Sequence, residues 1–468
     1  MKYIIFTFSG DGLPIAYHLQ QEGHEVVVAQ VIDYKSILTK EERRITEDEP
    51  PQEQKRRLSL YKNLVTKFPA DILLRKMKRI KDPENYFVFF DSNCLFRYAE
   101  KVYEMGFTKG NFPTEKDRLF EIDRDTAKNF VRKYYPDIKI AEKEEFRSIR
   151  RAKKFLKESN HGQIWVVKGK AEESLTIVPS TKDPELAKWQ IIESLDAFQE
   201  DYESAGFILE KAILDLVEIT PEKIYYDGVP LGMTLNFENK PFGSNNLSIQ
   251  TGCAADLVFP IGMENKIHDI AFPPIIDKLA KKHKGLFIWD ASLLIDRHTG
   301  DIYFGEFCPN RPGYNSFFTE LCQVPSVNYF FESVVAKKNP FTLGTVGASV
   351  TLFNLYRDPS ERYILSGASI NYTERSGKNI WVFDMHKKTK NDKMRIVGYD
   401  WHLAPITGSG KTIDEAVNNV FKNVKHFSLL GVYYRPKSDY LSKEYPTSIL
   451  NRLEYGMKKG LYTLPFAL

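Results

Sequence analysis

The stretch from Leu286 to Gly313 decides the fold, and its sequence is LFIWDASLLIDRHTGDIYFGEFCPNRPG. It predicts two strands, Leu286–Ile295 and Ile302–Phe307, because both segments are mainly apolar and are separated by turn residues. The intervening sequence DRHTGD, residues 296–301, contains the glycine and aspartates that favour a hairpin connection. We therefore expect an antiparallel hairpin here.

The predicted hairpin carries carboxylates on stiff backbone. Side chains alternate along a strand, so Asp290 and Ser292 share a face of the first strand, and Glu306 lies near the end of the second. Mg²⁺ takes one or two protein carboxylates and leaves its other positions to water and nucleotide phosphates. With Asn310 and Arg311 just downstream, the pattern suggests a site of phosphoryl transfer. A hairpin whose charges only face solvent is an equally weighted alternative for this stretch alone.

Length and charge bound the organisation of the chain. Its 468 residues exceed what one ordinary core holds, so roughly two to four domains are expected. The formal net charge is only +4, from 66 basic and 62 acidic residues, which gives little support to a dedicated nucleic-acid binder. We therefore expect no nucleic-acid partner.

Cysteine spacing and hydropathy indicate the compartment. The four cysteines, at positions 94, 253, 308 and 322, form no CxxC motif, which argues against a zinc site or a disulfide framework. The apolar run Tyr3–Phe8 is shorter than a signal-peptide core, and no later run reaches membrane-spanning length. A cytoplasmic protein without a membrane partner is expected.

The first 32 residues predict a strand, a glycine turn, a helix and a second strand. Gly10 and Gly12 fall where the helix begins, so the turn offers backbone N–H groups to an anion. The apolar strand 25–31 suits a parallel sheet that is covered on both faces. A dinucleotide fingerprint would need a glycine where Ala16 and Tyr17 stand, so a simple tight turn is favoured over NAD binding.

A charged segment, Thr39–Lys81, interrupts this α/β pattern, and its first half is expected to be a mobile excursion or solvated helix. Its apolar stripe between Leu73 and Ile80 favours a solvated amphipathic helix over a basic patch for nucleic acid. The apolar strand 86–90 follows and is succeeded by Asp91. Polar residues just beyond a strand commonly line a ligand crevice in open α/β sheets, so Asp91 is a candidate ligand contact.

Two further strands carry candidate nucleotide contacts. Lys168 ends the predicted strand Gln163–Lys168, where it could meet a phosphate or be an ordinary edge lysine. Glu210 and Lys211 follow an apolar run, and Glu218 comes one strand length later. Such a strand and linker can bind an adenine edge and ribose hydroxyls, although an ordinary strand has the same pattern.

A polar stretch, Leu235–Pro260, is rich in glycine, asparagine and serine. We expect a long functional loop here, with Thr251 and Gly252 as its anion-contacting point.

The segment TGSGKT, residues 407–412, is similar to a Walker A loop, but that motif needs a glycine where Pro405 stands. The spacing of Thr412 and Glu415 predicts the N-cap of a helix instead.

Taken in order, these motifs resemble the ATP-grasp superfamily and, within it, the phosphoribosylamine–glycine ligases. The resemblance covers about residues 2–435 and rests on the order and spacing of several short motifs. These are SGDGLPIA, LFEIDRDTAKNF, WVVKGK, ILEKAILDLVEI, QTGCAAD, GEFCPNRPG and GKTIDEAVNNVFKN with GVYYR. The resemblance implies ATP and Mg²⁺ or Mn²⁺ as cofactors, and an amide bond made through an acyl phosphate.

The resemblance also implies roles for individual residues. Arg124 and Lys168 would contact the nucleotide phosphates. Glu210, Lys211 and Ile213 would form the adenine hinge, and Glu218 would bind the ribose. The implied metal ligands are Asp290, Glu306 and Asn310. The implied substrate contacts are Gly10, Gly12, Asp91, Thr251, Gly252 and Asn310. Catalytic charge neutralisation is assigned to Lys168, Arg124 and Arg311.

The chain departs from the family pattern in three places. Cys308 replaces the family's asparagine two positions after the metal glutamate, so Asn310 is expected to supply the missing oxygen. The glycine-rich lid turn shrinks to GKAEES, residues 169–174, where Lys170 would close on the phosphates. The elements that handle a ribose phosphate are altered at the first turn and at FFDSNCLF, residues 89–96.

Three functions stay open on the sequence. The first is the phosphoribosylamine–glycine ligase reaction, which the end-to-end order of motifs favours. The second is an ATP-grasp ligase that joins another amino acid and amine, because the substrate elements are altered. The third is a binding protein that has lost catalysis, because of Cys308 and the short lid turn. Small-molecule substrates and a monomer or homodimer are expected.

The implied fold class combines α/β and α+β domains. The expected parts are a Rossmann-like N-terminal domain at 1–112 with an insertion at 39–81, an ATP-grasp domain at 113–342 with its lid at about 125–206, a small α+β domain at 343–440 and a tail at 441–468.

Overall fold

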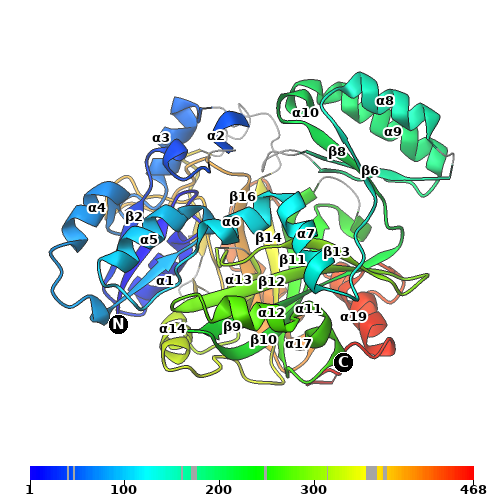
Figure 1. Cartoon of the computed structure of the whole chain (residues 1–468). Coiled ribbons are helices and arrows are strands. Elements are labelled where there is room, and N and C mark those ends of the chain that lie inside the picture. The colour runs from blue at the N-terminus through cyan, green and yellow to red at the C-terminus, as the bar shows by residue number, and fades with distance from the viewer. Residues whose placement is uncertain are drawn as a thin grey trace.

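The computed structural model describes the chain except residues 40–41, 46–47, 160–161, 170–175, 247–249, 314, 355–365, 373–376 and 468. Figure 1 shows a blue N-terminal α/β part at the left, a central sheet, and a lid that projects at the upper right. The architecture is mixed α/β with several sheets, as the sequence predicts. The exact domain limits remain predictions.

The N-terminal part is built on a parallel sheet of strand order β3-β2-β1-β4. Its strands are β1 (Lys2–Thr7), β2 (Val26–Gln30), β3 (Lys67–Pro69) and β4 (Tyr86–Phe90). Its helices are α1 (Leu13–Gln21), α2 (Glu42–Ile45), α3 (Pro51–Ser59), α4 (Ala70–Met77) and α5 (Phe96–Glu104). The expected βαβ opening is confirmed, and the apolar runs of β1 and β4 are buried.

The charged segment Thr39–Lys81 contributes to this sheet, which corrects the expectation that it interrupts the α/β pattern, whereas the helix predicted in its second half is confirmed. It supplies β3, which pairs in parallel with β2, and α4, whose Leu73 and Met77 are buried. Arg57 in the same segment is fully buried and donates two hydrogen bonds of 2.7 Å to the carboxylate of Glu49. The apolar stretches in this segment are short and lie between charged residues, so the strand β3 was not recognised in the sequence.

The central sheet has eight strands, in the order β13-β12-β9-β10-β11-β14-β16, with β18 paired to β14. They are β9 (Leu216–Tyr226), β10 (Val229–Pro241), β11 (Gln250–Ile261), β12 (Leu286–Asp296), β13 (Ile302–Phe307), β14 (Val346–Asn354), β16 (His402–Gly410) and β18 (Val432–Tyr433). The adjacent helices are α6 (Glu115–Ile122), α7 (Arg124–Tyr134), α11 (Lys266–Ala271), α12 (Pro274–Ala280), α13 (Asn315–Leu321), α14 (Val327–Val335) and α17 (Ile413–Val424). Helix α7 packs beside β13, which places Arg124 near the hairpin acids.

One expectation about this region is wrong. The stretch Leu235–Pro260 is mostly two antiparallel strands, β10 and β11, and not one long loop. Its polar residues Asn236 and Asn239 are buried, so they belong to an internal polar face of the sheet. Strand β11 also pairs with β14, and the predicted domain limit between residues 342 and 343 stays a prediction.

The segment 441–468 is not a free tail. Helices α18 (Ser438–Leu441) and α19 (Ile449–Lys458) fold back onto the sheet, and α19 contacts β9 and β10. The buried Arg452 of α19 donates to the carbonyl oxygen of Glu238 and to Asn239 Oδ1, each at 2.8 Å. The C-terminal helix is therefore a structural element of the central part.

The lid has a small sheet of its own, in the order β5-β8-β6-β7. Its elements are β5 (Lys143–Phe146), β6 (Trp165–Gly169), β7 (Thr176–Ile177), β8 (Phe207–Lys211), α8 (Ile149–Glu158), α9 (Pro184–Ala197) and α10 (Gln199–Ala205). A separate hydrophobic cluster that includes Leu156, Trp165, Ile191 and Leu209 holds it together. The lid turn, including Lys170, lies largely outside the described residues.

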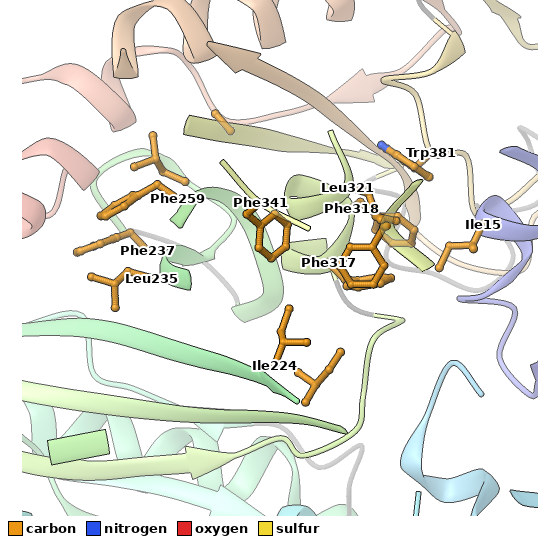
Figure 2. Close-up of a cluster of buried hydrophobic side chains, with 14 of the residues drawn as sticks. Ile15, Ile224, Leu235, Phe237, Phe259, Phe317, Phe318, Leu321, Phe341 and Trp381 are labelled. Carbon is orange, nitrogen blue, oxygen red and sulfur yellow. The ribbon is translucent and has the colours of Figure 1, made fainter. Parts of the chain in front are cut away.

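One hydrophobic core joins the N-terminal part to the rest (Figure 2). Phe317 and Phe318 of α13 lie near its centre, with Ile15 of α1 and Trp381 nearby. The ring centroids of Phe318 and Trp381 are 5.0 Å apart, and His18 of α1 stacks on Trp381 at 3.9 Å. Distant segments thus share one core.

Two smaller points complete the fold. Thr412 caps α17 by accepting a hydrogen bond from the N–H of Glu415, so the predicted helix start is confirmed. A short pair, β15 (Asn371–Tyr372) with β17 (Phe427–Ser428), lies at the periphery. Among the described residues, none of the helices is both long enough and apolar enough to cross a bilayer.

Candidate functional site

The predicted hairpin forms as β12 and β13. Ala291 lies opposite Phe307, and the register then shifts, so that Ser292 faces the stretch around Gly305. A Cβ at Gly305 would lie 2.6 Å from Ser292 Oγ, so the close approach of the two strands requires glycine here. This irregularity lies beside Glu306, the residue that the sequence places at the metal.

A lysine from β10 lies between the hairpin and β9. Lys240 Nζ donates to Glu306 Oε1 at 2.9 Å and to Glu218 Oε1 at 2.8 Å, and Glu238 Oε2 is 3.9 Å away. Ser292 Oγ also donates to Glu218 Oε1, at 2.7 Å. Glu218, the expected ribose acid, is therefore in the same charged cluster as Glu306.

The cations around Glu306 keep it ionised. The ammonium of Lys240 lowers the pKa of Glu306 to about 2, and the charges of Arg124 and Lys168 act in the same direction. Because Coulombic effects of this kind act over short distances in a protein, Arg124, Lys168 and Glu306 belong to one site. The structure thus brings together three residues that lie far apart in the sequence.

Asp290 has the opposite electrostatic setting. It lies opposite Glu222 of β9 in the sheet. Burial, reinforced by the charges of Glu222 and Glu238, raises the pKa of Asp290 well above its usual range. A bound cation would reverse this shift, because it would favour the carboxylate.

Two lysines hold a third acid in the lid. Glu210 Oε1 accepts from Lys168 Nζ and Oε2 from Lys128 Nζ, each at 2.5 Å. Burial alone would raise the pKa of Glu210, but the two ammonium groups lower it to about 2. Figure 1 shows the strands concerned, β6 and β8, in the lid above and to the right of α7, which carries Lys128. Both lysines are therefore fixed at the junction of the lid and the central part.

Lys128 is a site residue that the sequence analysis did not single out. Asp123 caps α7 by accepting from the N–H groups of Asp125 and Thr126, so Arg124 is the first helical residue. Residues four apart share a helix face, which puts Lys128 one turn beyond Arg124. The four-residue spacing of Arg124 and Lys128 in the sequence RDTAK could have indicated that both residues face the same site.

Two backbone N–H groups of the proposed adenine hinge are already hydrogen-bonded within the protein. The N–H of Lys211 donates to Glu142 O at 2.8 Å and that of Ala212 to Ile164 O at 2.9 Å. The Lys211 side chain is exposed, and Ile213 is half-buried. Other backbone groups of this linker would have to meet an adenine edge.

Asn310 does not fit the expected metal and substrate roles. Its side chain is fully buried, with Oδ1 accepting from the N–H of Ile288 at 3.2 Å and Nδ2 donating to Asp117 Oδ2 at 3.0 Å. Both ends of the amide are therefore committed to the fold. Asn310 was expected to replace, two positions later, the asparagine that the family has at the metal. This expectation is corrected, because the Asn310 amide oxygen accepts from the backbone N–H of Ile288 in β12.

The turn after β1 meets the end of β4. The N–H of Gly12 donates to Asp91 Oδ2 at 2.7 Å, and that of Gly10, whose φ is +110°, donates to Thr7 Oγ1 at 3.0 Å. Burial, together with the charge of Asp11, raises the pKa of Asp91 to about 8. Gly10, Gly12 and Asp91 thus form one corner, as expected, but the corner is acidic.

Arg311 faces this acidic corner. Its guanidinium is paired with Glu121, and its positive charge opposes the upward pKa shifts of Asp11 and Asp91. Burial raises the pKa of the neighbouring Cys308 thiol well above its usual range, so Cys308 is not a thiolate nucleophile.

Thr251 and Gly252 lie in strand β11 and not in a loop. Thr251 Oγ1 donates to Lys240 O at 2.7 Å, and His402 Nε2 lies 2.7 Å from Thr251 O. His402 also pairs with Asp400 at 3.3 Å, and this carboxylate helps to raise the pKa of His402 although burial opposes it. Thr251 therefore connects the Lys240 cluster to the acidic corner.

Comparison with known proteins gives a fold. No protein-family model and no curated protein matches the sequence. The crystal structure of Thermotoga maritima phosphoribosylamine–glycine ligase aligns over 93% of this chain and 99% of that chain, with a TM-score of 0.57 and 15% identity. The chain has the ATP-grasp fold.

Two biotin carboxylases share the ATP-grasp fold with the chain. The biotin carboxylase domain of Hydrogenobacter thermophilus 2-oxoglutarate carboxylase, solved with MgADP, ADP and bicarbonate, aligns over 99% of this chain and 96% of that chain, with a TM-score of 0.54 and 12% identity. Campylobacter jejuni biotin carboxylase, in a β,γ-ATP complex, aligns over 99% and 97%, with the same TM-score and identity. The resemblance to the ATP-grasp superfamily is thus confirmed at the level of fold.

The residues of this ATP-grasp fold suit a metal-bound nucleotide. Asp290 and Glu306 are hard oxygen donors on paired strands, and Mg²⁺ needs only one or two such carboxylates when phosphates supply the rest. Lys168, Lys128 and Arg124 lie on the adjacent side as phosphate counter-charges.

Proposed function

We propose that the chain is an ATP-dependent ligase that joins a carboxylic acid to an amine. The observation that carries the proposal is the convergence of Lys128, Lys168 and Arg124 with Glu306 and Asp290 between the lid and the central sheet. Phosphoryl transfer needs this set of groups, because its catalysis consists mainly of positioning and charge neutralisation.

The chemistry runs in two steps. ATP transfers its γ-phosphoryl group to a carboxylate oxygen, which gives an acyl phosphate and ADP. The nitrogen of a neutral amine then attacks the acyl carbon, the C–O bond to phosphate breaks, and the amine loses a proton as the amide forms. No protein nucleophile takes part in either step.

The chain's own residues divide this work. Lys168 and Lys128 would hold the phosphates, after their release from Glu210, and Arg124 would neutralise charge on the transferred group. Arg311 would steady the acyl phosphate. Glu306 and Asp290 would hold Mg²⁺ or Mn²⁺, which supplies Lewis-acid neutralisation when it is bound.

The substrate class is the finer part of the proposal. The order of motifs and the fold support the pair glycine and phosphoribosylamine as the first candidate. The charges around the proposed acceptor elements favour a different amine, because Asp11, Asp91 and Asp400 lie there and Arg311 is already paired. A phosphate group would meet the carboxylate of Asp400 and would have to compete with Glu121 for Arg311, whereas an unphosphorylated amine would not.

An acceptor assay tests the proposal. The chain is mixed with ATP, Mg²⁺ and pairs of acids and amines, and ADP release and the amide mass are followed. Glycinamide ribonucleotide from glycine and phosphoribosylamine would support the first candidate. ADP release and an amide with another pair, but none with phosphoribosylamine, would eliminate it and support the second.

A non-catalytic binding protein is the remaining alternative, suggested by Cys308 and the short lid turn. We expect Lys168→Ala and Glu306→Ala each to abolish ATP turnover. A wild-type chain that binds ATP but releases no phosphate with any acid and amine would support the binding protein and contradict the ligase. A cytoplasmic location and a monomeric or homodimeric state remain predictions.

A further inference from the structure

Lys240 is the cation that contacts the proposed metal ligand Glu306 directly. Its ammonium lies between Glu218 and Glu306, at 2.8 and 2.9 Å, and its side chain is only 25% exposed. The two acids come from different strands, β9 and β13, which are not adjacent in the sheet. Lys240 therefore bridges across β12 and fixes the spacing of the acids.

The charge balance explains why this bridge is needed. Four carboxyl groups, those of Glu218, Glu238, Asp290 and Glu306, surround this point. Burial alone would discharge Lys240, but Glu218 and Glu306 raise its pKa well above the usual range. Lys240 is thus the counter-charge that its two nearest carboxylates, those of Glu218 and Glu306, share.

The position of the ammonium overlaps with that of a metal ion. A divalent cation of the Mg²⁺ type binds a carboxylate oxygen at about 2.0–2.1 Å. The ammonium already takes Glu306 Oε1. A divalent cation on the same oxygen would meet the charge of the ammonium, so the two cations compete for Glu306 Oε1.

We propose that Lys240 is a built-in counter-cation of the metal site, which holds Glu306 until a divalent cation displaces it. Once displaced, the ammonium keeps its contact with Glu218, which Ser292 holds in place. Without a metal, Lys240 neutralises Glu306 and holds it in place. A divalent cation therefore binds weakly until the nucleotide phosphates supply additional ligands. This proposal rests on the nucleotide site proposed above.

The test measures Mn²⁺ binding to the full chain without substrates, from the electron paramagnetic resonance signal of free Mn²⁺. Lys240→Met should bind Mn²⁺ at least ten-fold more tightly than wild type, because the competing charge is gone. Lys240→Arg should bind no more tightly than wild type. Glu306→Gln in the Lys240→Met background should abolish the gain.

Lys223→Met is a matched control, because Lys223 is a buried lysine on the adjacent strand that pairs with Asp277 at 3.0 Å. It should leave Mn²⁺ affinity unchanged. Affinity that is equal or weaker in a folded Lys240→Met chain overturns the proposal. If that variant does not fold, a structure of the wild type with Mn²⁺ and a non-hydrolysable ATP analogue decides instead.

In that structure the proposal requires Lys240 Nζ to have left Glu306, and an intact contact overturns it. The Mn²⁺ titration involves no turnover. A failed ligase assay therefore bears on the proposed function alone, and a failed titration bears on Lys240 alone.

Discussion

Lys128 and Lys168 share the carboxylate of Glu210, so both ammonium groups are placed before any nucleotide arrives. Such preorganised charges are worth more than mobile ones, because they cost no rearrangement during the reaction. We expect Lys128→Met to lower kcat/KM for ATP by about 10²-fold, the scale found for loss of one preorganised donor. Steady-state ADP release measures the effect.

Lys133→Met is the control, since Lys133 is an exposed lysine on the same helix. It should leave kcat/KM unchanged. Equal activity of Lys128→Met and wild type would exclude Lys128 from the site.

Glu238 gives a pH prediction at the same scale. Burial raises its pKa from 4.5 to about 8, with smaller contributions from neighbouring acids. Between these values the unfolded chain is ionised and the folded chain is protonated, so this group stabilises the fold below pH 4.5 and its contribution is lost as the pH rises to about 8.

We therefore expect the free energy of unfolding of wild type to fall between pH 5 and pH 8 more steeply than that of Glu238→Gln. Urea denaturation at several pH values measures the two slopes. Identical slopes would mean that Glu238 is ionised in the folded chain.

At the scale of elements, periodicity predicted some parts well and others poorly. The hairpin of β12 and β13 and the capped helix α17 were predictable, because their apolar patterns and turn residues are local. Strands β3, β10 and β11 were missed. In β3 only three residues pair, so the signal is short. In β10 the apolar residues Leu231, Met233, Leu235 and Phe237 alternate with polar ones, which is a strand pattern, but the polar residues between them favoured a loop.

The segment TGSGKT yields the prediction at this scale. Thr412→Ala should cost about 1 kcal/mol of stability, the usual value of an N-cap, and Thr412→Ser should cost much less. Thermal denaturation measures both. Lys411→Ala should leave ATP turnover unchanged, whereas loss of turnover would restore the Walker A interpretation.

At the scale of the whole molecule, residues beyond 441 complete the central part. Arg452→Met would leave Glu238 O and Asn239 Oδ1 without their donor. We expect a loss of about 3 kcal/mol, since each buried group left unpaired costs about 1–3 kcal/mol. Chemical denaturation measures it, with Lys458→Met, on the exposed end of the same helix, as the control.

An unchanged midpoint in Arg452→Met would mean that α19 is dispensable. Such a result would return the segment 441–468 to the status of a tail.

The candidate site shows the same division between local and distant information. Lys168, Glu210 and Glu306 could be found in the sequence, because each lies near the end of a recognisable apolar strand. Lys240 and its pairing could not, since they depend on which strands become neighbours and in what register. Asn310 was misassigned for that reason too, because its partners Ile288 and Asp117 become close only on folding.

The amide of Asn310 has a consequence for the kinetics of isotope exchange. Through Ile288 and Asp117 it connects β12 to α6, and Asp117 in turn accepts from His283 at 3.0 Å. The N–H of Ile288 is thus enclosed by groups from several segments. In deuterium oxide, that proton should be among the last to exchange, and in Asn310→Ala it should exchange orders of magnitude sooner, through local opening rather than global unfolding.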